Sequence, residues 1–315
     1  MSGILAVLHR DGRPVEPASV ERMLAVMSQR GVDGVDSLLS GPAALARQHL
    51  WETPEDVDQC QPLVDERSGV ALVFDGRLDG REWLCEALSL APTRSLSGPD
   101  ARLVMEAYLR WGEDFAERLL GDFALAVWDP RRHEMILARD ALGTRGLSYH
   151  LDDRRLLAAS DVGALLRHPD LSSDIDEASV ARYLASHWDD QESTFFASVR
   201  HLPPAHTLAV GCGRARRRRY WSLDPERRAP RASLAENAEA LRSLLFEATA
   251  DRLRCRGPVG ASLSGGLDSS SVAAVAAAVT ARRSGGAPLR AYTYAFDRFA
   301  EYDERPWARL VTDHC

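Results

Sequence analysis

The stretch LSGGLDSS, residues 263–270, decides how the C-terminal part of the chain folds. The apolar run Val259–Leu263 leads into it and predicts a strand, and the alanine-rich segment Ser270–Thr280 after it predicts a helix. A second apolar run, Leu289–Phe296, predicts another strand. A strand, a helix and a further strand are typical of a βαβ unit. This unit implies a parallel sheet, with Ser264–Ser269 as the glycine-rich loop between the first strand and the helix.

The loop has the composition of a phosphate-binding turn. Its two adjacent glycines allow a tight turn in which several N–H groups converge, and the positive end of the following helix dipole faces the same point. The hydroxyls of Ser264, Ser269 and Ser270 add uncharged donors, and Asp268 offers an oxygen ligand for Mg²⁺. An ordinary strand-to-helix turn is one alternative. A nucleophile elbow is another, but it requires G-x-S-x-G, whereas residues 260–264 read GASLS.

Lysine is missing from the sequence, because all 39 of the Lys and Arg positions in the 315 residues are arginine. This excludes, within this span, a lysine Schiff base, a lysine general base and the phosphate loop that ends in Gly-Lys. A nucleotide site here must therefore work through backbone amides, arginine or a metal ion.

The overall composition argues against several classes of partner. The net charge is −7, and the only dense basic stretch, Arg214–Arg219, is expected on a solvated turn, so we predict no nucleic-acid surface. Five cysteines without a metal-ligand spacing indicate a reduced, cytoplasmic protein without structural zinc. No apolar run approaches about 18 residues, which predicts neither a membrane span nor a signal peptide.

The first two-thirds of the chain alternate short strands with occasional helices and so predict an α+β architecture. The apolar runs predicted as strands are Ile4–Leu8, Val70–Phe74, Phe123–Trp128, Met135–Ala138 and Leu156–Ala159. Helical spacing at Val20–Met27 suggests a helix capped by Ser19, and Leu103–Trp111 suggests one capped near Asp100. We place a linker over residues 211–232, between domains at 1–210 and 233–315, and expect a helix over Ala238–Ala248 at the start of the second domain.

Several motifs in this order resemble one protein family. Residues 264–270 resemble the pyrophosphate loop of the N-type ATP pyrophosphatases, and the whole chain is similar to the asparagine synthetase family, which joins a glutaminase domain to such an ATP domain. The matching segments are QRG at 29–31, QPL at 61–63, GDFALAVWD at 121–129, RDALGTRGL at 139–147, LPP at 202–204 and YW at 220–221. In the fourth segment Gly146 stands where the family usually has proline.

The resemblance implies a fold and a reaction. The N-terminal domain would be a four-layer αββα glutaminase-like domain of the N-terminal-nucleophile type, and the C-terminal part an α/β parallel-sheet ATP pyrophosphatase domain. In this family a carboxylate attacks the α-phosphorus of ATP, and an amine then displaces AMP from the acyl-adenylate to form an amide. The expected cofactors are ATP and Mg²⁺, and the chain is expected to be an ATP-dependent carbon–nitrogen ligase.

The resemblance also assigns residues to the nucleotide site. Pyrophosphate and Mg²⁺ would be held within the loop, with Leu263 and Tyr294 lining the adenine pocket. Leu263 and Tyr294 could equally belong to an ordinary core. The residues assigned to the loop are Ser264, Gly265, Gly266, Leu267, Asp268 and Ser269, and Asp268 is the expected metal ligand.

The N-terminal domain departs from the glutaminase pattern. Ser2 stands where hydrolysing members have a cysteine nucleophile, and it remains only a candidate nucleophile because a hydroxyl needs stronger activation than a thiol. Asp75-Gly76 replaces the Asn-Gly pair whose asparagine helps to form the oxyanion hole, and an anionic Asp75 would repel an oxyanion. Arg47 and Asp100 match residues that grip glutamine, so a remnant pocket is expected, although a surface ion pair and a helix cap are structural alternatives. We predict that glutamine hydrolysis is lost.

These departures, with EYDER at residues 301–305, resemble the amide-forming branch that includes lasso-peptide cyclases and β-lactam synthetases. In that branch the amine belongs to the substrate, here a small molecule or a precursor peptide. The alternatives are a glutamine-hydrolysing asparagine synthetase and a non-catalytic homologue that serves as a binding module. Only 46 residues follow Ser269, whereas each βαβ unit takes about 30. We therefore expect a truncated ATP domain, which a partner chain could complete.

Overall fold

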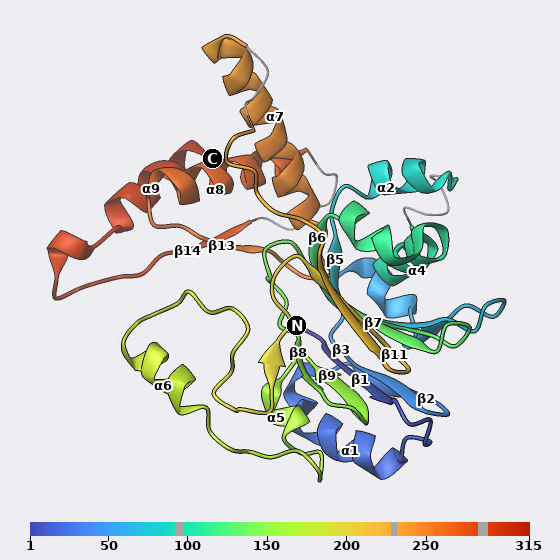
Figure 1. Cartoon of the computed structure of the whole chain (residues 1–315). Helices are drawn as coiled ribbons and strands as arrows, with labels where there is room; N and C mark the ends of the chain where they lie inside the picture. Colours follow the sequence, from blue (N-terminus) through green and yellow to red (C-terminus); the bar gives the residue numbers. More distant parts are fainter. Residues whose placement is uncertain (92–96, 228–231, 283–288) are drawn as a thin grey trace. The chain divides into compact units, whose positions relative to one another are not determined.

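The computed structural model describes residues 1–91, 97–227, 232–282 and 289–315. The chain divides into two compact units. The first contains residues 1–51 and 55–223, and the second contains residues 52–54 and 224–315. Each unit is described separately below, with the element labels of Figure 1.

One antiparallel sheet of the first unit contains the N-terminal strand at its centre. Its strands follow the order β10-β8-β9-β1-β3-β2. Their bounds are Arg200–His201, Ser148–Leu151, Arg155–Ala159, Gly3–His9, Ala43–His49 and Gly34–Ser40. In the pairing of β1 with β3, Ile4 lies opposite Arg47. The start of the chain is therefore fixed between two neighbouring strands.

The second sheet of this unit is also antiparallel, with the order β12-β11-β7-β6-β5-β4. Its strands are Arg214–Arg219, His206–Gly211, Glu134–Arg139, Gly121–Asp129, Ala71–Leu78 and Leu63–Val64. All five strands expected from apolar runs in the first two-thirds of the chain lie in these two sheets, and most of their ends extend beyond the predicted bounds by one to four residues. The longest pairing, β5 with β6, places Gly76 opposite Phe123.

The two sheets are packed face to face, with helices on both outer faces. An inner core between the sheets includes Ile4, Leu45, Val73 and Ala124. Helices α1 (Pro17–Val26) and α5 (Val162–Leu165) cover the first sheet, and α2 (Arg81–Leu88) and α4 (Asp100–Trp111) cover the second. The four-layer αββα arrangement expected for this unit is therefore observed (Figure 1).

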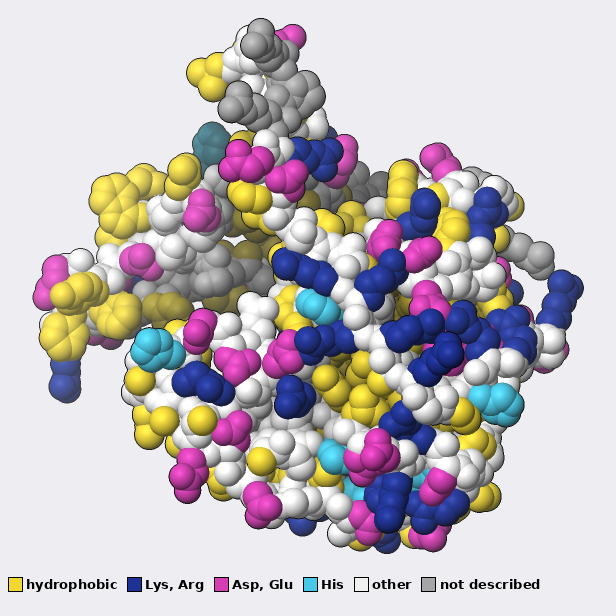
Figure 2. All heavy atoms as spheres, in the orientation of Figure 1, with side chains coloured by type: hydrophobic (Ala, Val, Ile, Leu, Met, Phe, Trp, Pro, Cys, Tyr) yellow, Lys and Arg dark blue, Asp and Glu magenta, His cyan; other side chains and the backbone are white. Residues whose placement is uncertain are grey.

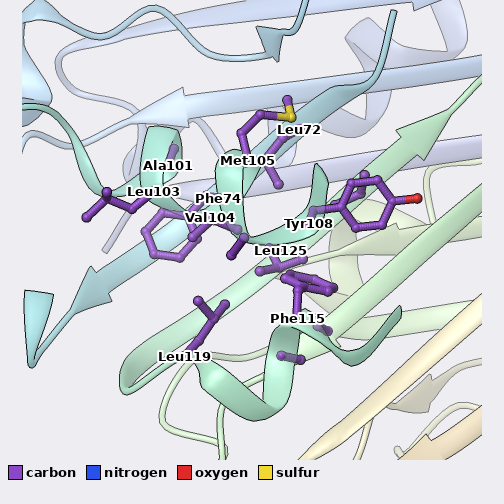
Figure 3. Packing of buried hydrophobic residues seen from close by; sticks show 14 of the residues in the cluster. Leu72, Phe74, Ala101, Leu103, Val104, Met105, Tyr108, Phe115, Leu119 and Leu125 are labelled. Carbon is purple, nitrogen blue, oxygen red and sulfur yellow. The ribbon is translucent and has the colours of Figure 1, made fainter. Parts of the chain in front are cut away.

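Alternation along the strands explains these layers. In β5, Val73 faces the inner core, whereas Leu72 and Phe74 face the outer core beneath α4. Figure 3 shows this outer core, where Phe74 and Leu125 lie close to Val104, Tyr108 and Phe115. The same alternation determines which polar residues at the strand ends point inward.

Both expected helix caps in this unit are wrong. The first helix begins at Pro17 with Glu16 at its N-cap, because proline has the backbone angle of a first helical residue, and Ser19 lies inside the helix. The other begins at Asp100 itself, after Pro99. The Asp100 carboxylate accepts a hydrogen bond from the backbone of Leu78 (2.8 Å) instead of capping its own helix.

The arginine run is a strand, not the expected solvated turn, and residues 214–219 therefore do not belong to a linker. Strand β12 pairs with β11 along its whole length. Its guanidinium groups are balanced by carboxylates: Arg216 bonds to Glu113 and Glu134 (both 2.9 Å), and Arg218 bonds to Glu117 (2.8 Å). Figure 2 shows such interleaved basic and acidic side chains on the surface of the first unit. Strand pairing and charge pairing explain why a run with alanine as its only apolar residue forms a strand.

The second unit contains the expected βαβ arrangement. Strands β13 (Gly260–Ser262) and β14 (Arg290–Tyr292) are parallel, and α8 (Leu267–Ala281) lies between them in sequence. Both strands are shorter than the apolar runs predicted. Helix α7 (Leu234–Arg252) begins with a capping box formed by Ser233 and Glu236, and α9 (Arg305–His314) ends the chain. In the described residues, no helix combines the length and the apolar character needed to cross a bilayer.

Three histidines of the first unit have lowered pKa values, and we therefore expect the first unit to be less stable in acid. Burial lowers the pKa of each, and a nearby arginine lowers it further. The pairs are His49 with Arg47, His168 with Arg155 and His201 with Arg139. Because the unfolded chain binds more protons near the ordinary histidine pKa, the free energy of unfolding falls as the pH drops through that value.

We expect the Tm to fall by a few degrees between pH values of about 7.5 and 5.5. Differential scanning calorimetry measures this directly. His201→Gln should reduce the dependence on pH, whereas His187→Gln, at an exposed position, should leave it unchanged. An equal Tm at both pH values would contradict the expectation.

Candidate functional site

The glycine-rich loop of the second unit has a backbone that only glycine permits. Gly265 has a φ of +79°, and a Cβ atom built on it would lie 2.3 Å from Cβ of Trp307. Gly266 differs, because its φ is −71° and the nearest atom to a built Cβ is the Ser264 hydroxyl at 3.4 Å. The two adjacent glycines thus have separate roles. Gly265 allows the close approach to α9, and Gly266 caps α8.

Helix α8 starts inside the predicted loop. It begins at Leu267, so Asp268 and Ser269 lie in its first turn instead of in the loop. Acidic and hydroxyl side chains are favoured there because the first backbone N–H groups of a helix lack partners within it and carry partial positive charge. The phosphate-binding hypothesis needs this geometry, since those N–H groups are the donors to an anion.

Serine hydroxyls hold the turn in shape. The Ser264 hydroxyl lies 2.9 Å from the Ser269 hydroxyl, and the latter accepts a hydrogen bond from the backbone N–H of Ser264 (3.2 Å). The Ser264 hydroxyl also accepts from the N–H of Gly266 (3.3 Å). Ser270 stands apart, because its hydroxyl is buried and has no hydrogen-bond partner among the described residues. The structure therefore brings together Ser264, Gly266 and Ser269, and leaves Ser270 outside this network.

The loop fits a nucleotide phosphate with magnesium. Asp268 is exposed at the start of α8, where its carboxylate can take one position on the ion. Within the described ranges, no group of three or more His, Cys, Asp or Glu side chains could hold a metal by itself. Magnesium is commonly held by one or two carboxylates together with substrate phosphates and water, so one aspartate beside a phosphate turn suits it.

The two residues expected at an adenine pocket lie in different surroundings. Leu263 is fully buried and packs with Ala273 of α8 and Ala308 of α9. Its backbone N–H donates to the carbonyl of Tyr292 (2.9 Å), which ties the loop to β14. Tyr294 is 76% exposed. Leu263 therefore has a clear role in the core of the unit, and Tyr294 is the residue open to a ligand.

Three residues expected at the remnant pocket lie at one end of the inner core of the first unit. Ile4, Leu45 and Val73 face this core, so alternation turns Ser2, Arg47 and Asp75 toward the same space. All three are at most 2% exposed. That these positions form one ligand pocket stays a prediction.

The Ser2 hydroxyl is held by three hydrogen bonds. It donates to the carbonyl of Leu50 (3.1 Å) and accepts from the N–H of Leu50 (3.1 Å) and from a guanidinium nitrogen of Arg47 (3.2 Å). Arg47 therefore lies inside the unit, and the surface ion pair considered for it is excluded by its burial. A hydroxyl whose proton is given to a backbone carbonyl is poorly placed to attack a substrate.

Asp75 has a buried cation beside it. A guanidinium nitrogen of Arg145 lies 3.6 Å from its carboxylate, and both side chains are buried. Next to it, Gly76 passes so close to β6 that a Cβ atom would lie 2.2 Å from the carbonyl oxygen of Asp122. Gly76 is thus required for steric reasons. Asp75, which stands at the position of the family's asparagine, instead carries a charge that is paired with Arg145.

Arg145 was not predicted as a site residue, and Asp140 holds the segment that carries it. The Asp140 carboxylate accepts hydrogen bonds from the N–H groups of Leu142 (3.1 Å), Thr144 (3.0 Å) and Arg145 (3.0 Å). The Arg139 guanidinium donates to the carbonyls of Gly143, Arg145 and Leu202, each at 2.7 Å. The family motif at residues 139–147 indicated that this segment is structured. It did not indicate that Arg145 pairs with Asp75.

Asp100 joins a second charge cluster. Besides Leu78, its carboxylate contacts the guanidinium of Arg81 at 3.2 Å, and Arg81 also contacts Glu55 at 3.2 Å. Arg81 and Asp100 are both buried. Asp100 thus fixes the end of β5 near Gly76. This role differs from the helix cap expected from the sequence.

Comparison with known proteins assigns family models to two successive parts of the chain. The family model described as a glutamine amidotransferase domain matches residues 1–221, and the one described as asparagine synthase matches residues 240–315. The packed sheets and the first match define a glutamine amidotransferase-type domain. With the second match and the relatives below, the chain belongs to the asparagine synthetase family.

Two of the most similar relatives cover nearly the whole chain. The glutamine-hydrolyzing asparagine synthetase 3 of Bacillus subtilis is 28% identical over 95% of this chain and 50% of its own length. Amidase chry2 of Gibberella zeae is 29% identical over 98% of this chain and 47% of its own. The chain therefore spans about half the length of the curated relatives it matches.

Among solved structures, the glutamine phosphoribosylpyrophosphate amidotransferase of B. subtilis in complex with ADP and GMP is similar with a TM-score of 0.49. It is 16% identical over 94% of this chain and 67% of that chain.

Proposed function

We propose that this chain belongs to an ATP-dependent amide-forming ligase in which a carboxylate is adenylated and then attacked by an amine. ATP would transfer its adenylyl group to this carboxylate with release of pyrophosphate, and AMP would leave when the amine attacks. The first N–H groups of α8 and the hydroxyls of Ser264 and Ser269 would hold the phosphates, and Asp268 would hold Mg²⁺. The family membership and the constrained turn at Gly265 support this assignment.

Two observations support the substrate itself as the source of the amine. The Ser2 hydroxyl is buried and held by Arg47 and Leu50, and a carboxylate at Asp75 stands where an oxyanion donor is needed. Such a pocket does not favour glutamine hydrolysis, so the amine would come from the substrate itself. A lasso-peptide cyclase-like reaction has this form: a side-chain carboxylate of a precursor peptide is joined to the N-terminal amine of that peptide.

A second candidate is a glutamine-hydrolysing asparagine synthetase. The names of several relatives favour it, including those of the B. subtilis and Methanocaldococcus jannaschii proteins. A third is a binding module without turnover. Isotope exchange between pyrophosphate and ATP separates the first function from the third. Exchange that depends on an added peptide carboxylate supports the ligase, and binding of Mg·ATP without exchange for any carboxylate supports the module.

Glutamine hydrolysis distinguishes the first two functions. We expect the wild-type chain to release no glutamate above that of Ser2→Ala, because both nucleophile and oxyanion donor are missing. The double variant Ser2→Cys with Asp75→Asn should exceed either single variant by at least about tenfold, since the two groups act on the same step. Glutamate is measured by a coupled dehydrogenase assay. Release by the wild type at the rate of the double variant would exclude the proposed amine source.

A further inference from the structure

A cavity lined by aromatic side chains lies beside α6 (Glu177–Leu184) of the first unit, and none of its lining residues belongs to the two sites described above. Its volume is about 370 Å³. The Tyr183 ring packs edge-to-face against Trp188 and Phe195, with centroids 5.2 Å apart in both pairs. Trp188 is nevertheless 68% exposed. An exposed aromatic cluster at a cavity is unusual on a surface, because such rings gain free energy when a ligand covers them.

Hydrogen bonds fix the wall of this cavity. Asp190 accepts from the N–H groups of Glu192 (2.8 Å) and Ser193 (3.0 Å) and from the Arg182 guanidinium (3.0 Å). Contacts with Ser193 and Glu192 lower the Asp190 pKa to about 2, so it is ionised throughout the physiological range. The Thr194 hydroxyl lies 2.9 Å from the carbonyl of Val199 and donates to it. A preformed wall binds with less loss of conformational entropy than a loop that must first become ordered.

A larger, more polar cavity of about 860 Å³ adjoins the aromatic one. The two share Arg182, Asp190 and Ser193 as lining residues. Trp221 and Asp189 line the larger cavity, and Asp189 is next in sequence to Asp190, which lines both. Asp189 is exposed and makes no hydrogen bond or ion pair with any residue that the structure describes. The combined space therefore has an aromatic part beside Trp188 and a polar part that contains both the Arg182–Asp190 ion pair and Asp189.

We propose that these joined cavities bind an extended peptide, which places a large apolar side chain against Trp188 and a neighbouring basic side chain near Asp189. The aromatic cavity has room for one side chain, and the polar cavity has room for the chain that continues from it. A single small aromatic molecule would leave the polar cavity unused. Asp189 gives the charge complementarity for a cation, because Asp190 is already bonded to Arg182.

This inference rests on the proposed function in one respect, namely that the substrate is a peptide. It assigns the glutaminase-like unit a part in holding that peptide, in a region that neither the phosphate turn nor the remnant pocket uses. Because the aromatic cavity and the turn lie in different units, their binding properties can be measured independently.

Fluorescence anisotropy tests the inference with a fluorescein-labelled decapeptide of glycine and serine that carries a central Arg-Trp pair. We expect saturable binding that weakens by at least about tenfold when the peptide tryptophan is alanine, or when the protein carries Trp188→Ala. Trp83→Ala is the matched control, because Trp83 is 53% exposed on α2 and should leave binding unchanged.

Asp189→Asn tests the charge without removing an aromatic ring. It should weaken binding of the Arg-Trp peptide by about threefold and leave a Gln-Trp peptide unchanged. Equal affinity for the tryptophan and alanine peptides would overturn the inference. So would equally tight binding of N-acetyltryptophanamide, or self-association of the chain that Trp188→Ala abolishes. Mg·ATP binding without peptide binding would overturn this inference alone, and peptide binding without Mg·ATP binding would support it while contradicting the proposed function.

Discussion

Gly265→Ala is expected to destabilise the second unit by about 2 to 3 kcal/mol and to abolish detectable binding of Mg·ATP. The new Cβ atom would lie 2.3 Å from Cβ of Trp307, and the residue would keep a φ of +79° that alanine rarely adopts. Relief of this contact requires movement of the loop or of α9. Either movement would disturb the first turn of α8, whose N–H groups are the proposed phosphate donors.

Hydrogen exchange of the Leu263 amide measures the loss of stability in the second unit, since this N–H donates to the carbonyl of Tyr292 in β14. Gly266→Ala is the matched control in the same loop. Its built Cβ meets only the Ser264 hydroxyl at 3.4 Å, which is an ordinary contact. Equal exchange rates in the two variants would show that the close approach to Trp307 does not shape the turn.

Gly76→Ala is expected to cost the first unit at least about 3 kcal/mol and to leave much of the protein insoluble. A Cβ atom there would lie 2.2 Å from the Asp122 carbonyl oxygen and 2.8 Å from Cα of Phe123. Backbone on a central strand cannot move away as a flexible side chain can. The pairing of β5 with β6 would have to open, and the outer core of Figure 3 would lose its support.

Urea unfolding followed by hydrogen exchange across β5 tests this expectation. Gly146→Ala serves as the control in the same unit, because its nearest neighbour to a built Cβ is the Ser160 carbonyl oxygen at 3.4 Å. A Gly76→Ala protein as stable as that control would contradict the steric explanation for the retained glycine.

Elements with a continuous or periodic apolar pattern could be predicted from the sequence. The buried strand at Gly3–His9 is one example, and the unit β13-α8-β14 is another, although β13 and β14 are mostly exposed. Strand β2 (Gly34–Ser40) is mostly exposed, so its sequence has no apolar pattern that would predict a strand. The arginine run of β12 was predicted as a solvated turn, because its charges suggested an exposed segment without regular structure. Both are edge strands, and their order comes from pairing with a neighbour and, in β12, from carboxylates distant in sequence.

The candidate sites were predictable to different degrees for a related reason. The phosphate turn lies within one short stretch, so its residues and their spacing were visible together. The pairing of Asp75 with Arg145 and the contact of Asp100 with Arg81 join side chains from separate elements. Their partners could not be inferred without the register of the sheets. The roles of Leu263, Tyr294 and Asp268 at a bound nucleotide stay predictions.

Titration of the isotopically labelled chain with Mg·ATP, followed through the amide resonances of Gly265 and Gly266, tests the central claim most directly. The account predicts saturable shifts of these two amides and of the first turn of α8, even when binding is weak, while the amide of Ser2 remains unchanged. It also predicts that Gly265→Ala removes the shifts and Gly266→Ala retains them. Wild-type spectra without shifts at the loop at millimolar Mg·ATP would contradict a phosphate site in this stretch.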